Sequence, residues 1–161
     1  MLKIDTHTHI MPEVIPNWSK EFGYGKFIHL EHHRKGFASM MQGNAFFREI
    51  EENCWNAELR INEYEKFNTQ VQVVCTIPVL FAYWAKPEHT LAVSEFLNNH
   101  IAEIVSKYPK NYVGLATLPM NNVAMAVSEL ERCKKIGFKG IQIGSNINQV
   151  NLSDVSFEPL W

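Results

Sequence analysis

Hydrophobic and polar positions along the chain form short apolar runs that alternate with longer segments of helical period. Residues 71–78 and 112–119 are almost continuously apolar, and each run ends in proline. Such runs are typical of strands that are buried on both faces of a parallel sheet. Residues 1–9 and 140–145 predict two further strands. The pattern therefore predicts four strands with longer segments between them.

Three of the segments between these strands show the apolar period of an amphipathic helix. Each begins at an asparagine cap or at a proline suited to the first turn, and each ends at a residue that stops helices. The expected helices run from Asn56 to about Asn68, from Pro87 to Tyr108, and from Asn121 or Asn122 to Gly137. Residues 157–161 predict the opening turn of another helix.

A long segment, residues 11–55, separates the first predicted strand from the first predicted helix. It contains aromatic residues and glycines, and it predicts two or three short strands of its own. Loops of this length within a domain are usually functional rather than passive connectors. We therefore interpret residues 11–55 as an insertion after the first strand.

The order of strands and helices predicts an α/β fold with a parallel sheet, for which two architectures are open. One is a doubly wound sheet and the other is a (β/α)8 barrel. The glycine-rich phosphate fingerprint that would follow the first strand of a dinucleotide-binding sheet is absent, so we favour the barrel. Because a complete barrel takes about 250 residues, we expect residues 1–161 to be the N-terminal half of one barrel domain, its first four β/α units.

The composition narrows the classes of partner. Of 161 residues, 46% are hydrophobic and 20% are charged, which is typical of a globular domain with a core. Basic and acidic residues number 15 and 17 without basic runs, so we expect no nucleic-acid or membrane partner. No signal-peptide or membrane-spanning pattern occurs, and we expect a cytoplasmic location. The three cysteines lack a Cys-x-x-Cys spacing, which argues against a structural zinc site.

The first strand carries the candidate chemistry. In a regular strand Asp5, His7 and His9 project to one face, and two imidazoles two residues apart can hold one metal ion. A His-x-His pair also arises readily by chance in a chain with seven histidines, so the pattern is weak by itself. We interpret the remaining histidines as structural or surface residues, namely His29, His32, His33, His89 and His100.

Several further motifs occur in a fixed order across the chain: Phe22–Gly25, Leu30–His33, Phe47–Arg48, Glu52–Trp55, Ile77–Glu88, Val113–Pro119 and Gly140–Gly144. Together with the paired histidines, they resemble the decarboxylase family of the amidohydrolase superfamily that acts on 2-amino-3-carboxymuconate 6-semialdehyde. The resemblance covers essentially the whole chain but only the N-terminal half of that family's sequence.

The resemblance implies a Zn²⁺-dependent, non-oxidative decarboxylase of tryptophan and kynurenine catabolism that diverts flux from quinolinate. It implies a cytoplasmic homodimer and a small dicarboxylate semialdehyde substrate. The first two metal ligands fall on His7 and His9, and Arg48 would bind a substrate carboxylate with Phe47 as a pocket wall. The insertion would cover the active-site mouth.

The resemblance also implies which parts of the site this chain does not contain. The remaining metal ligands and the histidine that acts as general acid and base belong to later strands, beyond Trp161. No catalytic residue is therefore expected within residues 1–161.

Two alternatives remain open. Another amidohydrolase-family decarboxylase, or a lactone hydrolase, could share the same first strand and act on a different acid. A truncated, catalytically inactive form could instead serve only as a dimer partner.

Overall fold

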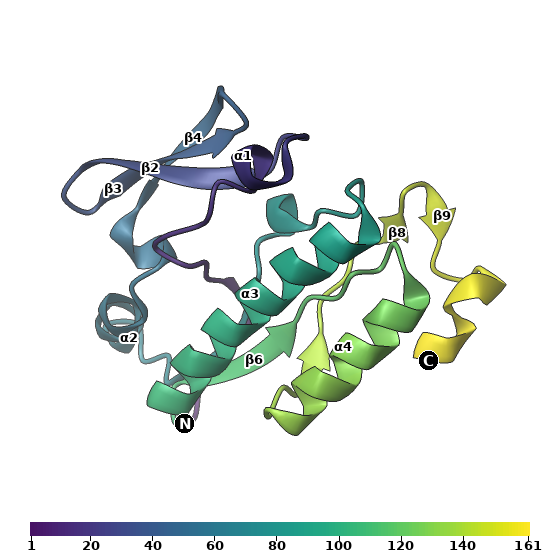
Figure 1. Ribbon diagram of the computed structural model, residues 1–161. Helices are drawn as coiled ribbons and strands as arrows, with labels where there is room; N and C mark the ends of the chain where they lie inside the picture. Colours follow the sequence, from purple (N-terminus) through teal and green to yellow (C-terminus); the bar gives the residue numbers. More distant parts are fainter.

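The computed structural model describes residues 1–161 and contains two main sheets, with long helices packed on one of them (Figure 1). The strands are β1 (Ile4–His9), β2 (Ile28–Arg34), β3 (Phe37–Gln42), β4 (Ala45–Glu51), β5 (Val71–Cys75), β6 (Tyr112–Ala116), β7 (Gly140–Ile141), β8 (Asn146–Ile147) and β9 (Val150–Asn151). The helices are α1 (Trp18–Phe22), α2 (Ala57–Glu65), α3 (Pro87–Lys107) and α4 (Val123–Lys135), with 3-10 turns at Glu52–Cys54, Pro78–Leu80 and Val155–Leu160. None of the helices combines the length and the apolar character needed to cross a bilayer.

The parallel sheet decides between the two predicted architectures. Its strand order is β1-β5-β6-β7, and each strand pairs in parallel with the next. A doubly wound sheet reverses its strand order at a switch point, whereas a barrel adds each strand beside the last. The α/β prediction is confirmed, and the sheet has the winding of half a (β/α)8 barrel. In Figure 1, α3 and α4 run side by side across the front of this sheet.

The two faces of the parallel sheet differ in burial. Val74 and Tyr112 face the helices and pack in one apolar cluster with Ile101 and Ile104 of α3. Val73 and Val113 pair with each other and lie next to Val74 and Tyr112 along their strands. Because adjacent strand residues face opposite sides, Val73 and Val113 face away from the helices, and they are only partly buried. The prediction that these strands are buried on both faces is therefore not met at Val73 and Val113, whose side chains are partly exposed.

The predicted helix starts and stops are confirmed. The Asn56 side chain accepts a hydrogen bond from the backbone of Leu59 at 3.0 Å, which caps α2. The Asn122 side chain likewise caps α4, and Pro87 is the first residue of α3. Gly137 follows α4 with a φ of +104°, a left-handed conformation that residues with a side chain rarely adopt. Local signals thus fixed these boundaries.

The last predicted strand is shorter than expected. The sheet ends at Ile141, although the pattern predicts a strand over 140–145. The Gly144 N–H donates to the Tyr83 hydroxyl at 3.4 Å instead of to a neighbouring strand, and the chain then turns into the β8-β9 hairpin. The predicted terminal helix turn is present as the 3-10 helix Val155–Leu160.

The insertion forms a small sheet whose core is shared with α3 and the turn before it. Strands β2, β3 and β4 pair in antiparallel order, which confirms the predicted short strands, while α1 was not predicted. Trp18, Met40 and Trp55 are buried in a cluster that also contains Val93 of α3. In Figure 1, this sheet lies at the top left, apart from the parallel sheet. The insertion is therefore a folded unit that docks on the N-terminal half of α3.

A second contact fixes the insertion to the loop before α3. The Tyr24 hydroxyl lies 2.8 Å from Nδ1 of His89 and accepts a bond from the Lys86 N–H at 2.9 Å. Gly25 has a φ of +82°, and a Cβ atom there would lie 2.5 Å from the ring of Trp84. Only glycine fits this contact, which explains the glycine in the Phe22–Gly25 motif.

A buried polar cluster joins α3, β6 and α4. The Asn98 side chain accepts a bond from the Thr117 N–H at 2.9 Å and donates to the Thr117 carbonyl at 2.8 Å. Its amide also donates to Glu129, whose side chain is buried, at 2.7 Å. Arg132 approaches the same carboxylate with two nitrogens, at 2.7 and 2.8 Å. The carboxylate thus holds the helix layer against the end of β6.

Replacing this carboxylate should destabilise the fold. We expect Glu129→Ala to lower the free energy of unfolding by about 3 kcal/mol, because it leaves Asn98 and Arg132 without their shared acceptor. Glu131→Ala, on the exposed side of the same helix, should change it by less than about 0.5 kcal/mol. Urea denaturation followed by circular dichroism measures both values. Equal losses in the two variants would contradict the assigned role.

His100 makes the stability depend on pH. Burial lowers the pKa of His100, although the Glu103 carboxylate and the Met11 carbonyl act in the opposite direction. Its Nε2 atom is buried without a hydrogen-bond partner. In the unfolded chain His100 takes up a proton near pH 6.5, whereas in the folded chain it does so only at lower pH. The free energy of unfolding therefore decreases as the pH falls below about 6.5. We expect His100→Gln to flatten the loss of unfolding free energy between about pH 6.5 and 5, measured by urea denaturation at each pH. An unchanged slope would show that His100 does not contribute.

Candidate metal centre

The two predicted ligands lie together at the C-terminal end of β1. The ring centroids of His7 and His9 are 4.7 Å apart, and the ring planes are nearly perpendicular, at 85°. His9 pairs with Cys75, the last residue of β5. Active sites of (β/α)8 barrels are built at this end of the strands. The structure thus brings the histidine pair to the edge of the sheet where chemistry is expected.

A β-bulge changes which residues share a face with His9. Asp5 pairs with Gln72 and Thr8 with Val74, so β1 contains one extra residue between them. Gln72 lies three residues from Cys75, the partner of His9, and therefore faces the opposite side. The prediction that Asp5 shares the face of His9 is wrong, because it assumed regular alternation. Asp5 instead accepts a hydrogen bond from the backbone N–H of His7 at 3.3 Å.

The environment of His9 favours the form that binds metals. Its Nδ1 lies 3.1 Å from the Thr76 carbonyl oxygen, which can only accept a bond, so Nδ1 carries the proton and Nε2 keeps its lone pair. Burial lowers the pKa of His9, and the neighbouring His7 lowers it further. The ring is therefore neutral at pH 7, with Nε2 available as a ligand.

Cys75 is a neighbour of the histidine pair that the sequence pattern did not reveal. Its Sγ lies 3.5 Å from Nδ1 of His9 and donates to the Thr8 carbonyl at 3.3 Å. Burial raises the pKa of this thiol to about 11, so it is protonated at neutral pH. Parallel pairing of two predicted strands could have placed the ends of β1 and β5 together, but the register could not be read from the sequence.

The side chains available as ligands determine which metal ion fits the site. Two imidazoles on one strand suit Zn²⁺ or another divalent transition metal. The structure contains no group of three or more His, Cys, Asp or Glu side chains that could hold a metal ion. A catalytic zinc site takes about three protein ligands. His7 and His9 therefore fit two positions of such a site and do not complete it.

Trp161, the last residue described, lies outside the candidate site. Its backbone N–H donates to the Glu158 carbonyl at 3.2 Å, and its side chain is exposed at the end of the 3-10 helix Val155–Leu160. Indole chemistry suits neither metal binding nor proton transfer, so Trp161 takes no part in the predicted reaction. The general acid/base histidine expected beyond Trp161 stays a prediction, because the structure describes residues 1–161.

Arg48 and Phe47 lie on β4 of the insertion. Met40 pairs with Arg48 and Met41 pairs with Phe46, so Phe47 is an extra residue in β4. Adjacent residues of β3 face opposite sides of the sheet. The bulge therefore places Arg48 on the same face as the fully buried Met40, and it places Phe46 on the opposite face. Both Arg48 and Phe47 are exposed. No salt bridge or hydrogen bond joins Arg48 to the histidine pair.

A hydrogen bond joins the two ends of the insertion beside the end of β1. The Cys54 carbonyl accepts a bond from the Met11 N–H at 3.0 Å, two residues after His9. Burial raises the pKa of the Cys54 thiol, and the positive charges of Arg60 and Arg48 act to lower it. The insertion therefore returns to the end of β1 directly after β4, the strand of Arg48.

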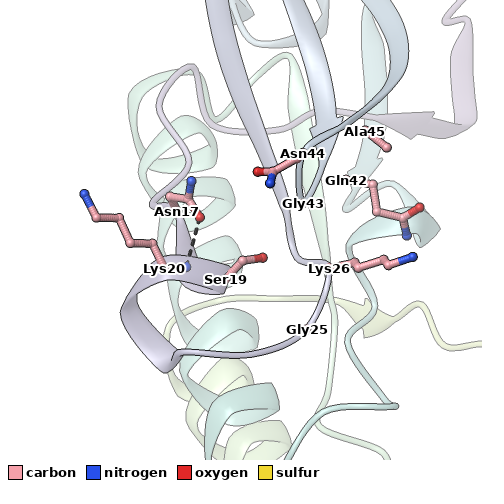
Figure 2. Close-up of a pocket in the computed structure, with 9 residues that line it drawn as sticks. All are labelled: Asn17, Ser19, Lys20, Gly25, Lys26, Gln42, Gly43, Asn44 and Ala45. Atoms are coloured by element: carbon pink, nitrogen blue, oxygen red, sulfur yellow. Dashed lines mark hydrogen bonds between the residues drawn. The ribbon is translucent and has the colours of Figure 1, made fainter.

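A wide groove lies apart from the histidine pair. It has a volume of about 780 Å³ and lies between α1 and the turn that joins β3 to β4 (Figure 2). Figure 2 shows that Lys20 and Lys26 extend from it in opposite directions. It contains neither the histidine pair nor Arg48, and we do not assign it to the metal centre. Its lining residues are Asn17, Ser19, Lys20, Gly25, Lys26, Gln42, Gly43, Asn44 and Ala45.

The other histidines make structural contacts. His89 stacks on Phe22 with ring centroids 3.8 Å apart, and His32 lies 2.7 Å from the Glu13 carbonyl. On the insertion sheet, His33 pairs with Glu49 at 3.2 Å. His29 is buried. These contacts support the structural interpretation of the remaining histidines.

Comparison with known proteins identifies relatives along nearly the whole chain. The chain is 47% identical over 161 residues to the 2-amino-3-carboxymuconate-6-semialdehyde decarboxylase of Dictyostelium discoideum, and the match covers 99% of this chain and 45% of that protein. The enzyme of the same name from Caenorhabditis elegans is 36% identical, with coverage of 99% and 45%. The chain therefore spans about half the length of the curated relatives it matches.

The fold comparison gives the same result. A crystal structure of 5-carboxyvanillate decarboxylase from Novosphingobium aromaticivorans, in complex with manganese and a nitrobenzoic acid, superposes with a TM-score of 0.73 at 19% identity. The match covers 99% of this chain and 46% of that one. At this identity the likeness concerns the fold alone. The sequence profile described as Amidohydrolase matches residues 4–161, and the chain belongs to the amidohydrolase family.

Proposed function

We propose that this chain forms part of the active site of a metal-dependent decarboxylase that converts 2-amino-3-carboxymuconate 6-semialdehyde to 2-aminomuconate 6-semialdehyde. The observation that carries the proposal is the pair of adjacent imidazoles, His7 and His9, at the C-terminal end of β1. The activity named for two relatives, at 47% and 36% identity, gives the substrate.

His7 and His9 would hold the metal ion, for which we propose Zn²⁺. When bound, the ion supplies Lewis-acid polarisation of an oxygen atom at the reacting centre. The chain's own contribution is orientation, because the Thr76 carbonyl fixes the His9 ring with Nε2 free. Burial lowers the pKa of His9, which favours the neutral ring that binds metals.

Arg48 would bind a substrate carboxylate, since the planar guanidinium matches a carboxylate with two parallel hydrogen bonds. Phe47, beside it on β4, would form a wall of the pocket. Decarboxylation breaks one carbon–carbon bond, leaves its electron pair on the substrate carbon and releases CO2, and that carbon then takes up a proton. We assign no side chain of residues 1–161 to deliver this proton, and we propose a histidine beyond Trp161 for that role.

The proposal extends to the setting of the enzyme. We propose a homodimer in the cytoplasm that acts in tryptophan and kynurenine catabolism, without nucleic-acid or membrane partners, and an insertion, residues 11–55, that covers the active-site mouth. The near balance of 15 basic and 17 acidic residues supports the absence of polyanionic partners.

Metal binding should depend on the histidine pair. We expect His9→Gln and His7→Gln each to weaken the binding of Zn²⁺ and Mn²⁺ by about tenfold or more, because each removes half of the donors. Isothermal titration calorimetry at pH 7.5 measures the affinities. His33→Gln, which changes an exposed histidine on β2, is the matched control and should keep the affinity of the unchanged protein. Equal affinity in all three variants would refute the site.

Substrate binding should depend on Arg48. We expect Arg48→Ala to lower kcat/KM by about 10- to 100-fold, which corresponds to the loss of one charge-assisted hydrogen-bonded pair of about 1.5–3 kcal/mol. The loss of substrate absorbance gives the rate. Arg34→Ala removes another exposed guanidinium of the same small sheet, one that is bonded to Glu49, and should leave the rate unchanged. Both rates are measured in the full-length protein, which would carry the later strands. A change within twofold for Arg48→Ala would remove its assigned role, and a purified full-length protein that leaves the substrate untouched would refute the function.

A further inference from the structure

Arg60, on α2, is a buried guanidinium that the proposed site does not use. Its side chain is 8% exposed, and it takes part in none of the salt bridges of the chain. Burying a cation is costly unless polar partners replace its water, and neutral partners do so less completely than a carboxylate. The position of this charge therefore calls for a reason other than stability.

The guanidinium joins two parts of the fold that are far apart in the sequence. Its Nε and Nη2 donate to the Gln72 side-chain oxygen on β5, at 3.2 and 2.8 Å. Its Nη1 donates to the Asn53 carbonyl at 3.0 Å. Asn53 lies in the 3-10 turn Glu52–Cys54, directly after the strand that carries Arg48. Arg60 thus ties the end of the insertion to the parallel sheet.

The next residue completes the connection to the metal strand. The Cys54 carbonyl accepts the Met11 N–H at 3.0 Å, and Met11 follows β1, the strand of His7 and His9. Ile10 is held differently, because its N–H donates to the Cys75 carbonyl of β5 at 3.1 Å. The Met11 bond is therefore the one that depends on where the 3-10 turn lies.

The geometry points to Arg60 as the positioning residue that sets the Arg48-bearing end of the insertion against the strand of His7 and His9. It touches no reacting atom and acts through Asn53 and Cys54. Lysine cannot replace it, because one ammonium group cannot reproduce a planar fork that bonds two acceptors in different directions. The role of Arg60 in substrate binding rests on the proposed function, whereas its role in the Met11 contact does not.

Amide hydrogen exchange tests the contact without any assay of activity. In Arg60→Lys, we expect the Met11 amide to exchange about tenfold faster while the Ile10 amide keeps its rate, since only the first bond relies on the turn. Two-dimensional NMR resolves the two neighbours. Acceleration of both amides would mean general destabilisation, and acceleration of neither would mean that Arg60 does not hold the turn; either result overturns the inference.

A double-mutant cycle tests the path to the substrate. We expect Arg60→Lys to raise KM by about tenfold with a much smaller change in kcat, because a carboxylate contact displaced by about 1 Å weakens binding before and during the reaction. In the Arg48→Ala background, Arg60→Lys should raise KM no further. Multiplying effects would show that Arg60 acts independently of Arg48 and would overturn the inference.

Two controls distinguish a failure of this inference from a folding defect and from a failure of the proposed function. If Arg60→Lys does not fold, Gln72→Met leaves the guanidinium in place and removes its anchor on β5, and it should give the same exchange pattern at Met11 and Ile10. If the full-length protein does not decarboxylate the substrate, the proposed function fails, while the exchange result still decides the role of Arg60.

Discussion

The arrangement of the candidate site depends on the parallel pairing of β1 with β5. This pairing joins residues that are more than 60 positions apart, and it sets His9 beside Cys75 and Thr76. Without this pairing, the Thr76 carbonyl would not fix the tautomer of the His9 ring. Burial would also no longer lower the pKa of His9. A local motif of two histidines becomes a metal-binding geometry only through this long-range contact.

The insertion lies between the two paired strands, so it must fold without separating them. It does so by sharing a core with α3 and by bonding to the half barrel near both of its own ends. Tyr24 bonds the start of α3, and Asn53 bonds Arg60 of α2. Because these contacts lie near both ends of the insertion, they restrict its rotation as well as its distance. A long inserted segment can thus carry a residue such as Arg48 at a defined place.

The sequence predicted the parts of this structure that depend on local physics. Asn56, Asn122 and Gly137 mark helix ends because a cap or a left-handed residue acts within a few positions. The bulges in β1 and β4 were out of reach, since each is a property of a strand pair and leaves no mark in either strand alone. The burial of Arg60 was missed for a related reason: its partners, Gln72 and Asn53, come from two other elements.

The open inner face and the incomplete donor set have one physical origin. Four strands form only half of an eight-stranded barrel, so the inner side chains of β5 and β6 lack partners across the barrel, and so do His7 and His9. Closing the sheet would bury the apolar side chains and, if the proposed function holds, bring the remaining donors toward the two imidazoles. Dehydrating the inner face would also strengthen the interaction of any bound cation with these ligands, because the local dielectric falls. Barrel closure and tight metal binding are therefore expected to be coupled, with each step favouring the other.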